Sequence, residues 1–123
     1  MANDLRHVVS DAPRVMVVDG SKLVRKLIGD TLLRELPGTE VIFSAGIAEA
    51  RETLAKGAVD LVTTALVLPD GDGLALARSV REAQGQAYVP VIVVSGNAQE
   101  ALESRAFTED VTDYFDKSLG HGA

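Results

Sequence analysis

The chain has 123 residues and a formal net charge of −6, and 46% of its residues are hydrophobic and 24% charged. This length predicts one domain, and aromatic residues make up only 4%, so the core is expected to be aliphatic. The acid excess argues against direct binding of nucleic acid. No apolar run reaches the roughly 20 residues that span a bilayer. Because the chain has no cysteine and no secretory pattern, a cytoplasmic protein is expected.

Short apolar runs and helical patterns alternate along the chain. Strands are predicted at residues 14–19, 40–44, 60–65, 89–95 and 111–116. Between them, apolar residues at spacings of three and four predict helices at residues 23–36, 47–56, 74–85 and 98–102. Residues 1–13 are expected to form an N-terminal arm, and residues 66–73 a loop that contains Pro69 and Gly73.

Five strands that alternate with helices predict an α/β fold with a parallel sheet and right-handed crossovers. Sites on such sheets lie at the carboxyl ends of the strands, near the point where the strand order reverses. Four residues fall at predicted carboxyl ends, namely Asp19, Ala65, Ser95 and Lys117. The sequence therefore directs attention to this edge of the sheet.

Several motifs surround these four residues. They are Val17-Val18-Asp19-Gly20-Ser21, Thr64-Ala65-Leu66-Val67-Leu68-Pro69-Asp70-Gly71-Asp72-Gly73, Val94-Ser95-Gly96 and Asp113-Tyr114-Phe115-Asp116-Lys117-Ser118. Together they resemble the phosphorylation pocket of a bacterial response-regulator receiver domain, over residues 14–118. The resemblance implies a flavodoxin-like (βα)5 three-layer sandwich with strand order 2-1-3-4-5. It also implies a role in two-component phosphorelay signalling.

The resemblance also shows what this chain lacks. Where the family has the aspartate that accepts the phosphoryl group, this chain has Ala65, which leaves no catalytic residue. Asp19 matches the first of two adjacent acids, but Gly20 stands where the second, a direct Mg²⁺ ligand, is usual. The third metal contact in the family is a main-chain carbonyl, which here would be that of Val67.

The remaining matches are the phosphate-binding and switch positions. Ser95 matches the residue that hydrogen-bonds the phosphoryl oxygen, Lys117 the phosphate-binding lysine and Tyr114 the switch aromatic. Ser118 replaces the proline that usually follows the lysine, so the cis bond of the family is not expected. Structural roles are also open: a helix cap for Asp19, backbone contacts for Ser95, and pairing with Asp19 for Lys117.

These losses predict a pseudo-receiver that binds no Mg²⁺ and needs no cofactor. Mg²⁺ prefers hard oxygen ligands with carboxylate charge, and here Asp19 and Lys117 leave a pocket with no net charge. We expect these two side chains to pair directly. The predicted function is then protein-protein contact without phosphorylation or enzymatic activity.

Other interpretations remain open on the sequence. The main alternative is a phosphorylatable receiver in which Ala65 is an engineered Asp→Ala change, although Gly20 argues against a single designed substitution. Asp70 or Asp72 could be a substitute acceptor, but turn chemistry explains both. A small-molecule site on the same fold would need a longer phosphate loop after the first strand. A hydrolase would need a nucleophile paired with histidine.

Residues 119–123 are expected to be a C-terminal tail in place of the last helix of a receiver. Six residues after Lys117, two of them glycine, are too few for a stable helix. An uncovered face of the sheet would then be a contact surface, either for a homodimer or for a protein partner or fused output domain. No direct contact with nucleic acid or membrane is expected.

Overall fold

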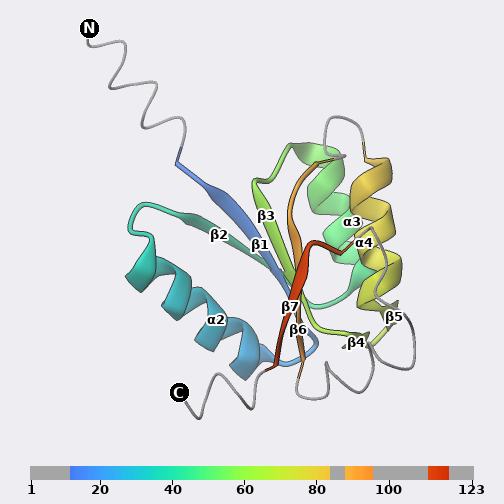
Figure 1. Ribbon diagram of the computed structural model, residues 1–123, viewed down its shortest axis with the longest axis horizontal. Coiled ribbons are helices and arrows are strands. Elements are labelled where there is room, and N and C mark those ends of the chain that lie inside the picture. Colours follow the sequence, from blue (N-terminus) through green and yellow to red (C-terminus); the bar gives the residue numbers. More distant parts are fainter. Residues whose placement is uncertain (1–11, 84–87, 96–110, 117–123) are drawn as a thin grey trace, which may run out of the picture.

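The computed structural model describes residues 12–83, 88–95 and 111–116, and its centre is a parallel sheet (Figure 1). Its strands are β1 (Arg14–Val18), β2 (Glu40–Ser44), β3 (Leu61–Thr64), β6 (Val91–Ser95) and β7 (Asp113–Asp116). They pair in the order β2-β1-β3-β6-β7, and each pair is parallel. This confirms the predicted strand order and places the reversal between β1 and β3.

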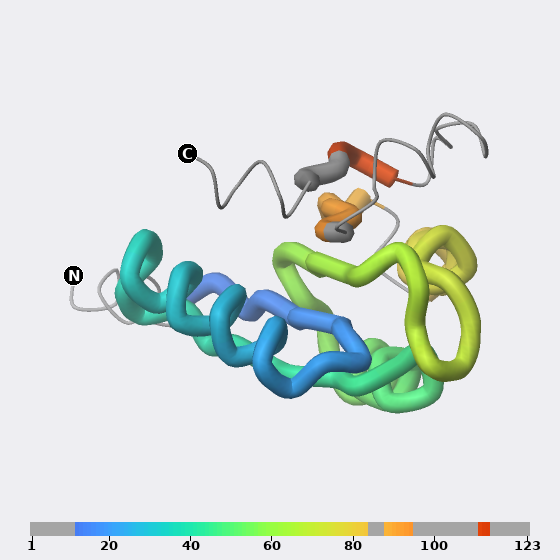
Figure 2. The backbone as a smooth tube through the Cα atoms, turned by 90° about the horizontal axis from the view of Figure 1, so that it is seen from below, coloured from blue at the N-terminus to red at the C-terminus, as the bar shows by residue number. Residues whose placement is uncertain are grey.

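Helices cover both faces of the sheet, which gives three layers. They are α2 (Lys22–Glu35), α3 (Ile47–Lys56) and α4 (Gly73–Glu82). In Figure 1, α2 lies on one side of the sheet and α3 and α4 lie together on the other, and Figure 2 shows the same arrangement from below. The helix predicted at residues 98–102, the N-terminal arm up to residue 11 and the C-terminal tail lie outside the described residues.

The core is aliphatic, as expected, and most of it lies between the sheet and the helices α3 and α4. Met16 and Val18 of β1 point into this part, whereas the alternating Val15 and Val17 point to the face that α2 covers. All four are at most 1% exposed. Burial on both faces explains why β1 is a continuous apolar run and not an alternating one.

The structure departs from the expected elements in the segment after β3. A loop was predicted for this segment, but residues Val67–Leu68 (β4) and Gly71–Asp72 (β5) form a short antiparallel hairpin. Helix α4 begins at Gly73, where the carboxylate of Asp72 accepts the N–H of Ala75 at 2.8 Å. Two-residue strands are too short for a period-2 pattern, so their sequence carries no strand signal.

Four predicted strands are shorter in the structure than the runs that predict them, β1 by the single residue Asp19 at its end. Asp60 and Ala65 flank β3, and their N–H groups still donate to the carbonyls of Arg14 and Val18, at 2.8 and 2.9 Å. Val89 and Val111 precede β6 and β7. The apolar run thus extends beyond the regular ladder by a residue or two at these ends. Among the described residues, no helix is long and apolar enough to cross a membrane.

Candidate functional site

Strand register brings three of the four candidate residues, Asp19, Ala65 and Ser95, together at the carboxyl edge of the sheet. Asp19 follows β1 and Ala65 follows β3, and the N–H of Ala65 donates to the carbonyl of Val18 at 2.9 Å. Ser95 ends β6, which pairs with β3 on its other side. Because these strands are parallel neighbours, their ends meet at one edge, as predicted.

Asp19 is a buried carboxylate held by the turn that follows it. It is 5% exposed, and its Oδ1 accepts the N–H of Ser21 at 2.8 Å. The carbonyl of Asp19 accepts from Nη1 of Arg25 at 2.6 Å, one turn into α2. The N-cap of α2 is Ser21, whose Oγ accepts the N–H of Val24 at 3.2 Å. The helix-cap role that the sequence left open for Asp19 therefore belongs to Ser21.

At Ala65 the site presents a methyl group. The residue is 7% exposed and belongs to the hydrophobic core cluster, and its carbonyl accepts the hydroxyl of Thr64 at 2.9 Å. Its own side chain has no atom that can attack a phosphoryl group or bind a metal ion. Among the residues that the structure describes, Asp19 supplies the carboxylate that the sequence assigns to this pocket.

Gly20 lies under the hairpin β4-β5. A Cβ at position 20 would lie 3.1 Å from Cδ and 3.2 Å from Cγ of Pro69, which is tighter than ordinary van der Waals contact. An aspartate at this position would therefore displace the proline ring by a few tenths of an ångström. Gly20 is exposed, so the carboxylate itself would have room in solvent.

The hairpin is fastened to the start of α3 by Asp70. Its two carboxylate oxygens accept the N–H groups of Ile47 at 2.8 Å and Ala48 at 3.0 Å. These two hydrogen bonds, with a smaller contribution from the charge of Arg51, lower the pKa of Asp70 below its ordinary value of 3.8. The site therefore keeps a carboxylate at its rim, and that carboxylate is already occupied as a helix cap.

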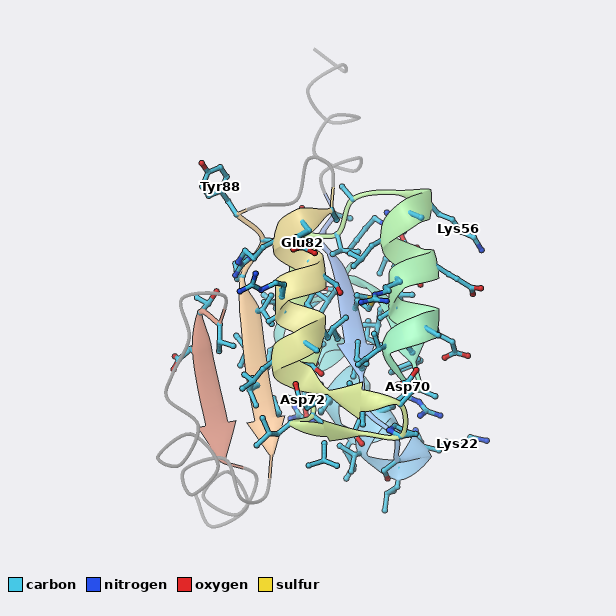
Figure 3. All side chains as sticks on the ribbon, turned by 90° about the vertical axis from the view of Figure 1, so that its right-hand side faces the viewer. Lys22, Lys56, Asp70, Asp72, Glu82 and Tyr88 are labelled. Atoms are coloured by element: carbon cyan, nitrogen blue, oxygen red, sulfur yellow. The ribbon has the colours of Figure 1, made fainter. Side chains whose placement is uncertain are left out.

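Sequence reasoning placed Asp70 in a solvent-facing turn and missed this contact. The side chain is exposed, as expected, but it serves a helix that begins 23 residues earlier. A signal existed in the sequence: Gly46 precedes α3 and has no side-chain oxygen, so the first N–H groups of α3 needed an acceptor from elsewhere. Figure 3 shows Asp70, Asp72 and Lys22 at the same end of the molecule.

The described residues offer few oxygen ligands to a Mg²⁺ ion. Asp19 is the single acid of the pocket among them, and one of its oxygens is already bound to the N–H of Ser21. Within the part of the chain that the structure describes, no group of three histidine, cysteine, aspartate or glutamate residues could hold a metal. The third family contact would be the main-chain carbonyl of Val67, which does not depend on the apolar side chain of this residue. Mg²⁺ usually keeps several waters and takes one or two protein carboxylates, so the expected loss of Mg²⁺ binding stays a prediction.

Several predicted site residues fall wholly or partly outside what the structure describes. Lys117 lies outside the described residues, and for Ser95 and Tyr114 only the backbone is described, in β6 and β7. The expected pairing of Asp19 with Lys117 therefore stays a prediction, as do the roles of Ser95 and Tyr114. A cavity of about 660 Å³ between α3 and α4 is a separate feature, with Lys56 and Glu82 on its rim, at the other end of the molecule in Figure 3.

Comparison with known proteins gives a consistent result. A profile of the response regulator receiver domain matches residues 15–122. The chain is 32% identical over 111 residues to the sensor histidine kinase TmoS of Ectopseudomonas mendocina, covering 90% of this chain but 11% of that protein. It is 28% identical over 107 residues to the chemotaxis protein CheY of Bacillus subtilis, covering 86% of each.

Solved structures agree with these relatives. The structure is similar to a sensor protein from Polaromonas sp. JS666, with a TM-score of 0.75 and 26% identity over 86% of this chain and 84% of that one. The chain spans 30% or less of the first two curated relatives, the sensor kinase and a protein-glutamate methylesterase of Anaeromyxobacter dehalogenans. The activities of those whole proteins therefore cannot be assigned from the matching region alone.

Proposed function

The chain belongs to the response regulator receiver domain family, and from this premise we propose that it is a receiver that signals through protein contact without accepting a phosphoryl group. The observation that carries the proposal is the buried methyl group of Ala65 at the carboxyl end of β3. In the family this is the position of the nucleophile. A residue with no lone pair to donate cannot form an acyl phosphate.

A second observation supports the same proposal. The metal position at Gly20 also lacks its acid, and the ring of Pro69 lies where the Cβ of that acid would need room. A pocket with three carboxylates and one lysine would attract a divalent cation, whereas Asp19 and Lys117 leave no net charge for it. The nucleophile and the metal site are thus lost together, and one substitution at Ala65 does not account for both.

The proposal includes partners and location. Receiver domains are fused to output domains or contact partner proteins, and here the contact surface would carry the whole signal. We propose no cofactor and no enzymatic activity for residues 14–118. A homodimer and a cytoplasmic location stay predictions.

The test is to restore the missing acids and look for the phosphoryl group. The chain, Ala65→Asp, Gly20→Asp and the double variant are incubated with acetyl phosphate and Mg²⁺ and analysed by intact mass spectrometry. We expect a gain of about 80 Da, lost on treatment with hydroxylamine, in the double variant alone, because attack needs both the nucleophile and the metal. Circular dichroism of each variant checks that the fold is kept.

Two results would contradict the proposal. A gain of about 80 Da in the unaltered chain would show an acceptor other than residue 65, such as Asp70. The same gain in Ala65→Asp without the second change would show that the metal site is intact, in favour of an engineered substitution. Calorimetric titration with Mg²⁺ gives an independent readout: we expect no saturation at millimolar concentration for the unaltered chain.

A further inference from the structure

Strand β2 is open on one side. In the sheet that the structure describes, β2 pairs with β1 and stands at the end of the strand order. The N–H of Glu40 donates to the residue before β1 at 2.8 Å, and the carbonyl of Ser44 accepts from the residue after β1 at 3.1 Å. Backbone groups alternate in direction along a strand, so the N–H and C=O groups of Val41 and Phe43 point away from β1.

The sequence of β2 has few features that would prevent another strand from pairing there. Exposed edge strands are usually protected by lysine, proline or a bulge, whereas β2 reads Glu-Val-Ile-Phe-Ser and pairs with β1 in an unbroken register. Its single charge is at one end, where Oε1 of Glu40 lies 3.3 Å from Nε of Arg14. The middle of the open side is therefore unprotected.

Apolar side chains lie beside the open side, on the face of the sheet that α2 covers. Phe43 is 49% exposed, and its ring packs under α2 at Gly29, where a Cβ would lie 2.6 Å from Cζ. Leu33 is one turn further along the same side of α2, and Leu36 follows at the end of the helix; each is 47% exposed. We call Phe43, Leu33 and Leu36 the β2 patch. Large apolar groups gathered on an exposed surface indicate a contact with another chain.

From the open backbone and the β2 patch we propose that β2 pairs antiparallel with β2 of a second copy of this chain. About a two-fold axis at Ile42, Val41 of each copy lies opposite the partner's Phe43, and each such pair exchanges two hydrogen bonds. On both sides of the axis the pairing also places an aromatic ring beside a β-branched side chain, which is a favourable cross-strand pair. The two parallel sheets would then form one continuous sheet.

The charges of β2 suit a second copy. In this register Glu40 lies opposite the partner's Ser44, so no like charges face each other. The strand at the other end of the described sheet, β7, begins and ends with aspartate. The same symmetric pairing at β7 would place Asp113 opposite the partner's Asp116, which is unfavourable. Of these two strands, β2 is the one that is complementary to itself.

The helices beside β2 allow the two copies to approach. Both α2 and α3 contact β1 and β2, so each lies over this strand pair on its own face of the sheet. Because neighbouring strands are about 4.8 Å apart, the α2 helices of the two copies would be two strand spacings, or about 10 Å, apart. This is close to the spacing of packed helices, about 8–10 Å. The two β2 patches would fill the space between the α2 helices, and helix contacts would add to the area buried by the strands.

Two other occupants of the open side fit less well. An extended segment of another protein could use the same backbone groups, but β2 itself already supplies a β-branched residue opposite Phe43. An anionic membrane would repel Glu40 and a chain of net charge −6. The proposal goes beyond the proposed function and does not depend on it, because the pairing of β2 does not involve phosphorylation of residue 65.

The experiment uses the whole chain and measures its mass and its amide exchange. Light scattering after size exclusion covers concentrations from about 1 μM to 1 mM, and we expect the mass to double over this range. Amide exchange of the ¹⁵N-labelled chain is compared at the two ends of the range. We expect protection to rise at Val41 and Phe43 and to change little at Ile42, whose N–H already bonds β1.

Disulfide cross-linking tests the register, because the chain has no cysteine of its own. Residues on the two-fold axis would form a non-hydrogen-bonded pair with Cα atoms about 4.5 Å apart, within the range of a disulfide. Ile42→Cys should therefore give a covalent dimer under mild oxidation, which a reductant reverses. Glu40→Cys is the matched control in the same strand: its two copies would be about 14 Å apart along the pair, so no covalent dimer is expected.

A charge on the open side should weaken the dimer. Phe43→Lys removes the ring and adds a charge, and we expect the dissociation constant to rise about tenfold or more. Tyr88→Lys makes the same change at an aromatic residue that is 96% exposed just before β6 (Figure 3), and it should leave the mass unchanged. Circular dichroism shows whether each variant is folded, and the exchange experiment needs no variant.

Three results would overturn the proposal: a monomer at every concentration, a dimer whose Val41 and Phe43 amides stay unprotected, or a disulfide in Glu40→Cys but not in Ile42→Cys. A dimer that Phe43→Lys leaves intact would assign the association to another surface. A chain that stays monomeric, but gains protection at Val41 and Phe43 when a synthetic peptide of the β2 sequence is added, would assign the open side to an extended segment of another protein. None of these measurements uses acetyl phosphate, so failure here is distinguishable from failure of the proposed function.

Discussion

Gly73 lies so close to the carbonyl of Ala65 that no side chain fits between them. A Cβ at position 73 would lie 2.2 Å from the Ala65 oxygen and 3.2 Å from Cγ2 of Thr64. The N–H of Gly73 donates to the carbonyl of Leu66 at 2.7 Å, which holds the two segments at this distance. Position 73 therefore needs glycine, because only a residue without a Cβ lets the first residue of α4 lie this close to Ala65.

This contact predicts the cost of a methyl group at residue 73. Gly73→Ala should lower the free energy of unfolding by about 2 kcal/mol or more, because the obstructing atom belongs to the backbone and cannot rotate away. Urea denaturation monitored by circular dichroism measures the change. Gly57→Ala is the control: its Cβ would lie 3.2 Å from Nη1 of Arg14, the tip of a flexible side chain. Equal costs for the two substitutions would contradict this account.

Much of the site was visible in the sequence at the scale of single residues. Asp19 and Ala65 were placed at strand ends from apolar runs, and parallel pairing then put them at one edge. What could not be predicted was the neighbour of each residue. The contact of Gly20 with Pro69 depends on how the hairpin β4-β5 folds back over β1, and the sequence has no local signal for that approach.

The pairing of Asp70 with α3 links two elements that are distant in the chain. The N–H groups of Ile47 and Ala48 lower the pKa of Asp70, so the folded state favours its charged form. A lowered pKa stabilises the fold above the unfolded value near 3.8, and this contribution is lost as the pH falls through the lower folded value. The helix dipole acts in the same direction, because the carboxylate lies at the N-terminus of α3.

The expected result is a substitution whose effect depends on pH. Asp70→Ala should lower the Tm by a few degrees at pH 7, and the difference from the unaltered chain should shrink as the pH falls below 3.8, the ordinary pKa of the group. Differential scanning calorimetry across this range measures it. Glu52→Ala, at an exposed position of the same helix, is the control and should change the Tm little at any pH. A pH-independent loss in Asp70→Ala would mean that its charge is unimportant.

Elements with their own periodicity were predictable, and elements defined by distant partners were not. The helices α2 and α3 and the strands β1 and β2 agree with the expected ranges to within a residue or two. The hairpin β4-β5 is held by Asp70 and by the tight packing of Gly71 against Ile47, where a Cβ would lie 2.5 Å from Cδ1. Both contacts join the hairpin to a segment more than 20 residues earlier.

The amino and carboxyl edges of the sheet differ in the contacts that their residues make. At the amino edge, arginines join neighbouring elements: Arg81 of α4 donates to the carbonyl of Val89 and to Thr112, which precede β6 and β7. At the carboxyl edge lie Asp19, Ala65 and the end of β6. These arginine contacts, which tie the strands to their neighbours, are thus at the end away from the proposed site.

Arg14 is the matching residue at the amino edge for β1, β2 and β3. Its Nη1 donates to the carbonyl of Ala58 at 2.6 Å, its Nε lies 3.3 Å from Oε1 of Glu40, and its backbone N–H donates to Asp60 at 2.8 Å. Arg14→Met keeps the apolar stem and the backbone bond but removes the guanidinium. Because the side chain is 35% exposed, the expected cost is about 1–2 kcal/mol of unfolding free energy.

The same substitution tests whether the two edges are independent. Arg14→Met should leave the amide shifts of Asp19 and Ala65 unchanged, and in the background of Gly20→Asp with Ala65→Asp it should not alter the extent of phosphorylation. Urea denaturation gives the cost at the amino edge, and ¹⁵N spectra with intact mass give the response at the carboxyl edge. If the stability loss came with shifts at Asp19 or with lost phosphorylation, the sheet would transmit strain between its edges, and the proposed site would depend on contacts made at the opposite end of the strands.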